Sequence, residues 1–297
     1  MPSAFRLSSL FLFLFLFSVS ASSQSTGKVI QERIVKSALL KKDVKYTIYL
    51  PADYESSDRT YPVVYLLHGY TDDNTGWLQF GEINRYADKA IAEGKIPPMI
   101  IIMPNADSTF YINAYDGKAD YENFFIKEFI PAVEKTWKIK SEKRFRGIAG
   151  LSMGGYGTLI YSLKYPELFA AAAPLSAFVT EEDALVKMPE ANYNATFGQL
   201  FGRGLKGQER VTKTFLDNHI LKIVADKSAN DLKKVRYWID CGDDDFLIRG
   251  NCTLHIALTE KAVPHEFRVR DGAHNWTYWR TGIVDALAFI GESFHQK

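Results

Sequence analysis

The stretch "GIAGLSMGGYG", residues 147–157, places one serine among closely spaced glycines in the order Gly-x-Ser-x-Gly. A strand-like run, "RFRGIAG" (144–150), comes before Ser152, and a helix-like run, "GYGTLIYSLKYP" (155–166), comes after it. A serine at such a strand-to-helix joint is typical of a nucleophile elbow, a strained turn that exposes the hydroxyl. Short Gly/Ser patterns also recur by chance, so the alternative is a glycine-rich turn with an incidental serine. The flanking strand and helix favour a nucleophilic Ser152.

Other short apolar runs alternate with helix-like segments along the chain. Three of them are unbroken, as in strands that are buried on both faces of a parallel sheet: "YPVVYLLHG" (61–69), "PPMIIIMPN" (97–105) and "VRYWIDCG" (235–242). One run alternates in polarity and reaches a proline, which predicts an exposed or edge strand: "VKYTIYLPADY" (44–54). The alternation predicts an α/β fold with a mostly parallel central sheet and helices on both faces. No linker or repeat divides residues 24–297, so we expect one domain.

Residues 178–232 interrupt this alternation, because they are polar and contain no clear strand. We expect a mostly helical insertion that lies over the carboxyl edge of the sheet. Within it, "GRGLKG" (202–207) matches the Gly-x-Gly-x-x-Gly pattern of dinucleotide-binding loops. No apolar strand precedes it, so we interpret it as a flexible loop and expect no cofactor.

The N-terminus has the features of a secretory signal peptide. Arg6 precedes the compact apolar run "LFLFLFLF" (10–17), and the small residues of "SVSASSQ" (18–24) follow. The apolar run is too short to cross a bilayer. We therefore predict a signal peptide over residues 1–23, a secreted or periplasmic protein, and no membrane association after cleavage. Because 36 Lys and Arg balance 35 Asp and Glu, we expect no nucleic-acid partner.

A serine needs a base to become a strong nucleophile, and His274 is the candidate. It lies in "DGAHNWTYW" (271–279), between the strand-like "HEFRVR" (265–270) and the last helix. In this type of fold the acid and then the base follow the nucleophile along the chain. The acid should follow the strand at 235–242. The other five histidines are expected to have packing or surface roles: His68, His219, His255, His265 and His295.

Three consecutive aspartates follow that strand, and the pattern alone does not choose among Asp243, Asp244 and Asp245. They lack the ligand spacing of a calcium loop, and the chain has no zinc motif, so we expect no metal. An oxyanion hole needs two backbone N–H groups. We expect one from Met153, which follows the nucleophile, and the other from Tyr70 in the loop after residues 61–69, with His68 shaping that loop.

Four ordered blocks together resemble the esterase D-like group of α/β hydrolases: "YPVVYLLHGYTDDNTGW" (61–77), "GLSMGGYG" (150–157), "CGDDDFL" (241–247) and "GAHNWTYW" (272–279). This group includes S-formylglutathione hydrolases, mycolyltransferases, and feruloyl and acetylxylan esterases. The resemblance runs from about residue 44 to the end, and it implies an α/β-hydrolase fold. It also implies that Asp245 is the acid and that the amides of Tyr70 and Met153 form the oxyanion hole.

These observations predict a secreted serine esterase that forms an acyl-enzyme on Ser152. The preferred substrate is an ester-decorated plant cell-wall polysaccharide or oligosaccharide, feruloyl first and acetyl next. An S-formylglutathione hydrolase is less favoured because that substrate is cytoplasmic, and a siderophore esterase is a third possibility. A non-catalytic carbohydrate-binding module remains the alternative of another class, although it would not need all of Ser152, Asp245 and His274.

A feruloyl group needs an apolar slot with aromatic walls. We expect Tyr70, Phe110 and Trp276 to line it, with the insertion closing it from above, whereas Trp77 and Trp279 belong to the core.

The two cysteines, Cys241 and Cys252, bracket the acid loop. They could form a disulfide that holds it, but a position for Cys252 on a following helix would keep them apart.

Overall fold

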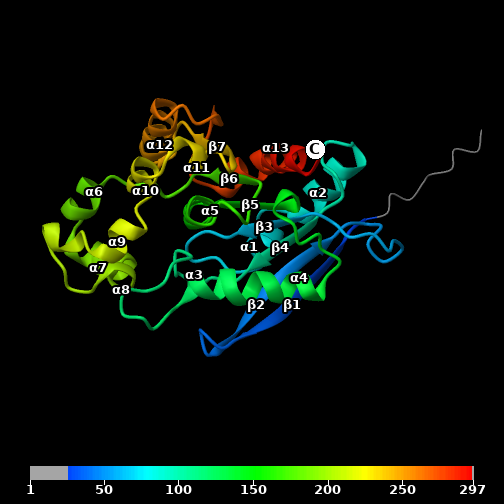
Figure 1. Ribbon diagram of the computed structural model, residues 1–297, viewed down its shortest axis with the longest axis horizontal. Helices are drawn as coiled ribbons and strands as arrows, with labels where there is room; N and C mark the ends of the chain where they lie inside the picture. Colours follow the sequence, from blue (N-terminus) through cyan, green and yellow to red (C-terminus); the bar gives the residue numbers. More distant parts are fainter. Residues whose placement is uncertain (1–25, 296–297) are drawn as a thin grey trace, which may run out of the picture.

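The computed structural model describes residues 26–295, and the predicted signal peptide (1–23) lies outside them. One eight-stranded sheet runs through the molecule in the order β1-β2-β4-β3-β5-β6-β7-β8 (Figure 1). The strands are β1 (Lys28–Ser37), β2 (Lys42–Leu50), β3 (Val63–Leu67), β4 (Ile100–Pro104), β5 (Arg146–Leu151), β6 (Ala171–Leu175), β7 (Arg236–Gly242) and β8 (His265–Arg270). Strands β3 to β8 pair in parallel, which confirms the predicted mostly parallel sheet.

The prediction that residues 44–54 form an edge strand was wrong. Strand β2 pairs antiparallel with β1 on one side and with β4 on the other. The true edge is β1, whose residues are mostly exposed and too polar to stand out in the sequence. It extends the sheet beyond β2, so that Ile48 and Tyr49 of β2 are fully buried.

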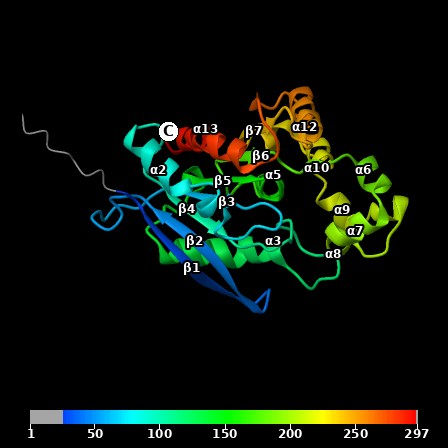
Figure 2. The same cartoon turned by 180° about the vertical axis from the view of Figure 1, so that it is seen from behind.

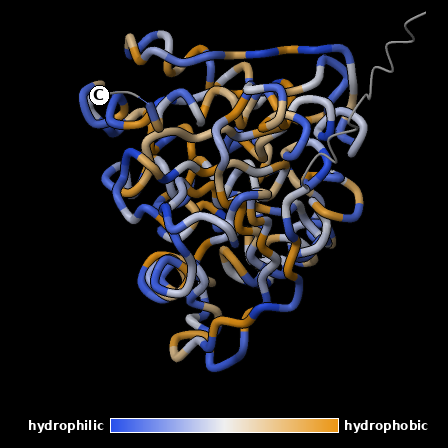
Figure 3. Tube along the Cα trace, turned by 90° about the vertical axis from the view of Figure 1, so that its right-hand side faces the viewer, coloured by the Kyte–Doolittle hydropathy of each residue, from blue (hydrophilic) through white to orange (hydrophobic). Residues whose placement is uncertain are grey.

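Helices cover both faces of the sheet, as predicted, and two views show the layers (Figures 1 and 2). Outside the insertion, the helical segments are α1 (Gly76–Gln79), α2 (Ile83–Ala92), α3 (Tyr121–Phe124), the π-helical turn η1 (Phe125–Phe129), α4 (Ile130–Thr136), the 3-10 turn η2 (Lys143–Phe145), α5 (Met153–Lys164), α12 (Ile248–Glu260) and α13 (Trp276–His295). Buried residues of α2 and α13 form one apolar cluster with the sheet, and those of α3 to α5 form the other. Apolar segments accordingly gather in the interior of the trace (Figure 3).

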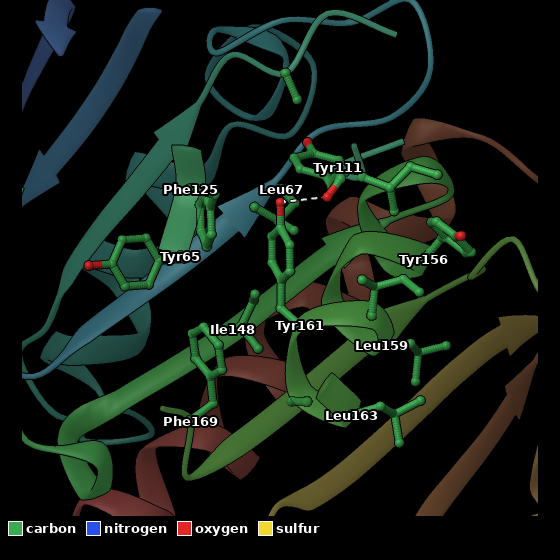
Figure 4. Packing of buried hydrophobic residues seen from close by; sticks show 14 of the residues in the cluster. Tyr65, Leu67, Tyr111, Phe125, Ile148, Tyr156, Leu159, Tyr161, Leu163 and Phe169 are labelled. Atoms are coloured by element: carbon green, nitrogen blue, oxygen red, sulfur yellow. Dashed lines mark hydrogen bonds between the residues drawn. The ribbon is translucent and has the colours of Figure 1, made fainter. Parts of the chain in front are cut away.

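Aromatic packing places the loop after β4 against the helix that begins at Met153. The ring of Phe125 stacks on Tyr161 of α5 with centroids 4.6 Å apart. The Tyr161 hydroxyl donates a hydrogen bond to the Tyr111 carbonyl at 2.7 Å (Figure 4). The Tyr111 hydroxyl in turn donates to the His68 carbonyl at 3.0 Å. The core therefore connects α5 with the loops that follow β3 and β4.

The predicted helical insertion is present between β6 and β7. It contains α6 (Glu182–Lys187), α7 (Glu190–Thr196), α8 (Gly198–Phe201), the 3-10 turn η3 (Gly207–Arg210), α9 (Lys213–Asp217), α10 (Ile220–Asp226) and α11 (Ala229–Leu232). Helices α6 to α9 form a group at the end of the molecule remote from β1 (Figure 1). The insertion is anchored to α5, because the Tyr156 hydroxyl donates to the Asn218 carbonyl at 2.7 Å and the Lys164 ammonium to the Asn218 side chain at 2.7 Å.

Two further expectations concern the cysteines and membranes. Cys241 lies on β7 and Cys252 on α12, and both are free, so a position for Cys252 on the following helix keeps the two apart.

Among residues 26–295, no helix has the length and apolar character needed to cross a bilayer.

Candidate active site

Ser152 occupies the joint between β5 and α5 in a strained backbone conformation. Its φ of 54° and ψ of −114° lie outside the regions that non-glycine residues usually adopt. Small neighbours are required there, because a Cβ on Gly150 would lie 2.6 Å from the Gly154 carbonyl oxygen, and one on Gly154 would clash with the Leu67 carbonyl. The turn thus lifts the hydroxyl above the carboxyl edge while β5 and α5 pack closely behind it, which is the geometry expected from the glycine pattern.

The structure brings Ser152, His274 and Asp245 into one hydrogen-bonded chain. The Nε2 atom of His274 lies 2.9 Å from the Ser152 Oγ, and its Nδ1 lies 2.8 Å from Asp245 Oδ2 and 3.0 Å from Oδ1. Asp245 is buried, whereas Asp243 and Asp244 are exposed. The geometry therefore selects Asp245 from the three aspartates that the sequence pattern left open.

The Asp245 carboxylate is surrounded by hydrogen-bond donors. Burial opposes its ionisation, but the hydrogen bond from His274 and that from the Leu247 amide at 2.8 Å outweigh this effect. They hold the pKa of Asp245 below its usual value. Asp245 is therefore a carboxylate at neutral pH, and it can orient the imidazole and stabilise its protonated form.

Two aromatic rings hold the His274 imidazole. Phe246 packs against it with centroids 4.6 Å apart, and Trp279 meets it edge-on at 4.8 Å. Trp279 is itself fixed, because its Nε1 donates to the Ser176 hydroxyl at 3.0 Å. These contacts restrict rotation of His274 away from Ser152.

One expected oxyanion donor follows the serine directly, and the other lies in a loop that approaches it, since a Cβ placed on Gly69 would be 3.7 Å from the Ser152 Cβ. Met153 is the first residue of α5, where an amide has no acceptor within the helix. Tyr70 follows Gly69, in the loop after β3. His68 is buried beneath this loop, where its Nε2 accepts from the Ala106 amide at 2.9 Å. Burial lowers the pKa of His68 to about 4, so its ring stays neutral and connects the loops after β3 and β4.

A family model described as "Putative esterase" matches residues 37–290. The chain belongs to this esterase family. A solved structure described as a ferulic acid esterase is 32% identical, with a TM-score of 0.80, over 91% of this chain and 99% of that chain. Esterase Rv1288 of Mycobacterium tuberculosis is 28% identical over 243 residues, which are 76% of this chain and 51% of that protein.

The endo-1,4-beta-xylanase/feruloyl esterase of Xylanibacter ruminicola is 35% identical over 153 residues, 48% of this chain and 21% of that protein. Both relatives are longer than this chain. The matched part of the chain spans about half of esterase Rv1288 and about a fifth of the xylanase/feruloyl esterase.

The aromatic side chains near Ser152 in this esterase-family chain differ in part from those expected. Tyr70 is 38% exposed and packs on Phe110, with centroids 5.7 Å apart. Phe110, which we expected to line the cleft, is only 4% exposed and lies behind Tyr70 and Phe178. Phe110 supports the rings of Tyr70 and Phe178 from behind and has little exposed surface of its own.

Trp276 also has a different setting from the one expected. Its ring packs against Trp77 and Phe80 with centroids 5.2 and 5.7 Å apart, and against Trp279. Trp276 thus packs against the apolar cluster that α2, α13 and the sheet form, and it fixes the end of the loop that carries His274. Trp77 and Trp279 are buried, as expected for core residues.

A cavity of about 370 Å³ opens between the start of the insertion and the start of α12. Phe178 and Phe246 line it, and the sequence analysis named neither of them. Both lie in loops without periodicity, so the only available signal was position: Phe246 directly follows the acid, and Phe178 follows a short Ala-rich segment. The cavity lies next to the triad, because the lining residue Phe246 packs on His274. The backbone amide of Phe178, another lining residue, donates to the backbone carbonyl of Ser152 at 3.2 Å.

The loops that carry the acid and the base are joined to each other. The Asp244 amide donates to the Gly272 carbonyl at 3.1 Å, and the Gly272 amide donates to Asp243 Oδ1 at 2.9 Å. In the described part of the chain, Asp243, Asp244 and Asp271 form the single cluster with metal-like spacing, and all three are exposed. Asp243 thus has a structural contact, and the triad is separate from this cluster.

Proposed function

We propose that the protein is a secreted serine esterase that hydrolyses hydroxycinnamoyl esters, feruloyl above all, on plant cell-wall polysaccharides. The observation that carries the proposal is the continuous Ser152–His274–Asp245 hydrogen-bonded chain next to a cavity that Phe178 and Phe246 line in part. Similarity to a ferulic acid esterase along 91% of the chain supports the acyl group. The predicted signal peptide (1–23) supports secretion, which would bring the enzyme to an extracellular polymer.

The geometry supports an acyl-enzyme mechanism. His274 Nε2 takes the Ser152 proton as Oγ attacks the ester carbonyl carbon, and the carbonyl electron pair moves onto oxygen. The amides of Tyr70 and Met153 hold this oxyanion, and the N-terminus of α5 adds favourable potential. As the intermediate collapses, the imidazolium returns its proton to the leaving alcohol and the acyl group stays on Ser152. Water, deprotonated by His274, then releases the acid and restores the serine.

The non-catalytic binding module fits the structure less well. A binding protein would need neither the strained backbone of Ser152 nor a base within hydrogen-bonding distance of its hydroxyl. Such strain costs folding free energy of order 1–3 kcal/mol, and the elbow gives it a purpose only if the hydroxyl reacts.

The test is hydrolysis of methyl ferulate, acetylated xylan and p-nitrophenyl acetate by the purified chain and by Ser152→Ala. We expect methyl ferulate to have the highest kcat/KM. The alanine variant should lose roughly 10⁵- to 10⁶-fold in kcat while its melting temperature stays within a few degrees, because the interaction removed acts mainly in the transition state. A clear preference for the acetyl esters would point to an acetylxylan esterase. Full activity in the alanine variant would contradict the nucleophile.

A further inference from the structure

The cavity beside the triad changes character along its length. The two lining residues with contacts to the triad are aromatic: Phe246 packs on the His274 imidazole, and the Phe178 backbone amide is bonded to the backbone carbonyl of Ser152. The wall formed by α6 and α12 carries charged groups instead. Glu181 and Arg249 come from the two segments that line the cavity, and Glu181 Oε2 lies 3.3 Å from Arg249 Nη2.

The charged wall begins a short distance along the chain from Phe178. Glu181 is three residues beyond Phe178, so at most about 10 Å of chain separates their Cα atoms. Its side chain is 40% exposed, against 83% for Arg249, so the carboxylate is the more enclosed member of the pair. An acceptor that is partly shielded from water and held by a cation discriminates better between ligands than a free surface carboxylate does.

We propose that this cavity holds the acyl group, and that Glu181, oriented by Arg249, accepts a hydrogen bond from the phenol hydroxyl of a 4-hydroxycinnamoyl ester. The proposal rests on the proposed function and adds the residue that selects the ring substituent. Along a hydroxycinnamoyl group, as along the cavity, the apolar part comes first and the polar part last. The vinyl and ring carbons follow the carbonyl, and the hydroxyl is at the far end.

A sugar in this cavity would have the opposite order. Its hydroxyls begin at the carbons next to the ester oxygen, so they would face Phe178 and Phe246 and lose water without gaining partners. The carbohydrate therefore extends from the site toward solvent, and the acyl group occupies the cavity.

The first experiment measures discrimination between two acyl groups with methanol as the constant leaving group. The intact enzyme should prefer methyl p-coumarate to methyl cinnamate, which lacks the hydroxyl, by roughly three- to tenfold in kcat/KM, as expected for one hydrogen bond. Glu181→Leu should bring the ratio close to one, and Arg249→Met should lower it part of the way. The control Asp217→Leu removes the carboxylate of an exposed ion pair with Lys213 on α9, and it should keep the ratio of the intact enzyme.

The second experiment decides which half of the ester occupies the cavity. Ala184 is a small, exposed residue of α6 that lines it, so Ala184→Trp should narrow it. The loss in kcat/KM should be at least tenfold greater on methyl ferulate than on methyl acetate. A loss that instead depends on the alcohol, larger for a feruloylated arabinoxylan oligosaccharide than for methyl ferulate, would assign the cavity to the sugar and overturn the proposal.

Failure of this proposal and failure of the proposed function have different signatures. If the intact chain hydrolyses no hydroxycinnamoyl ester, the function itself is wrong. If it hydrolyses methyl p-coumarate and methyl cinnamate equally well, or if Glu181→Leu retains the discrimination, the function stands and the role of Glu181 is wrong.

Discussion

The catalytic loops and the insertion (178–232) are held in place by different kinds of contact. The acid and base loops follow the parallel strands β7 and β8, and backbone hydrogen bonds join them, such as that from the Asp243 amide to the Arg270 carbonyl at 3.1 Å. The insertion contains no strand within residues 178–232. Its apolar side chains, such as Phe197 and Phe215, pack into the main core cluster, and side-chain hydrogen bonds connect its own loops. Arg210 is the main example, because its buried guanidinium donates to the carbonyls of Leu205 and Leu185 and covers the Tyr193 ring at 4.3 Å.

This difference separates two requirements of the enzyme. Catalysis needs reacting atoms at fixed distances, and strand ends in one sheet provide them because their positions depend on many backbone bonds at once. Substrate selection needs a surface that can differ between related proteins, and a segment that contributes no strand can change without breaking the strand pairing of the sheet. Substitutions in the two regions should therefore have different consequences.

The largest effect should come from the acid. Asp245→Asn should lower kcat by about 10⁴-fold. The amide oxygen of the variant would keep accepting from the Leu247 amide, so its NH2 group would face Nδ1 of His274 and favour the wrong tautomer of the imidazole. Asp243→Asn and Asp244→Asn are the matched controls, and each should cost less than about tenfold, since both side chains are exposed and outside the triad. Steady-state kinetics on methyl ferulate will rank the three variants. A greater loss in Asp244→Asn than in Asp245→Asn would contradict the assignment of the acid.

The second effect is acid sensitivity of the oxyanion loop. Unfolding restores the His68 pKa from about 4 to its ordinary value near 6.5, so the unfolded chain binds more protons between these values. Burying the neutral ring therefore contributes stability in full above pH 6.5, and this contribution decreases as the pH falls to 4. Its size is roughly 3 kcal/mol.

Urea unfolding at pH 7 and pH 4.5, in the intact chain and in His68→Gln, will measure how much stability the buried His68 loses on acidification. The glutamine variant should be less stable at pH 7 and should lose less stability on acidification. An equal loss in both proteins would mean that His68 is not the group responsible.

The catalytic edge could be predicted from the sequence further than the insertion could. The elbow requires small residues at set positions around Ser152, and the strands on either side of it are apolar enough to recognise. Strand β6 has no such signal, because its "AAAPL" is short, rich in alanine and interrupted by a proline. The choice of Asp245 came from the resemblance to a family, since the direction of a side chain in a loop leaves no periodic pattern.

The insertion left no comparable signal. Its helices could be expected in general, but the contacts that hold them join residues with no regular spacing. Arg210 and its acceptor Leu185 are one such pair, and Tyr156 and Asn218 are another. Only the structure shows that the insertion brings Phe178 and Glu181 to the cavity.

The third effect tests the side chain that holds the insertion together. Arg210→Met keeps much of the apolar stem but removes the guanidinium that donates to the carbonyls of Leu205 and Leu185, which should cost about 2 kcal/mol. Hydrogen exchange should rise across 178–232 and stay unchanged in the strands. Hydrolysis of methyl ferulate should lose more in KM than in kcat, because all three side chains of the triad lie outside residues 178–232. Arg203→Met, on the same segment, is the control. Faster exchange in β5 to β8 would contradict the independence of the two regions.

The smallest effect concerns the tether between the two regions. The buried Tyr156 hydroxyl on α5 donates to the Asn218 carbonyl in the insertion, and Tyr156→Phe removes that bond while the ring remains in place. The expected cost is about 1 kcal/mol, with some of it offset if water reaches the freed carbonyl. Since Lys164 still binds Asn218 from the same helix, the insertion should stay docked, and Tyr156→Phe combined with Lys164→Met should cost more than the sum of the single changes. Thermal unfolding of the three variants completes this double-mutant cycle. Strict additivity would mean that the two contacts act independently and that the docking of the insertion depends on its apolar packing against α5.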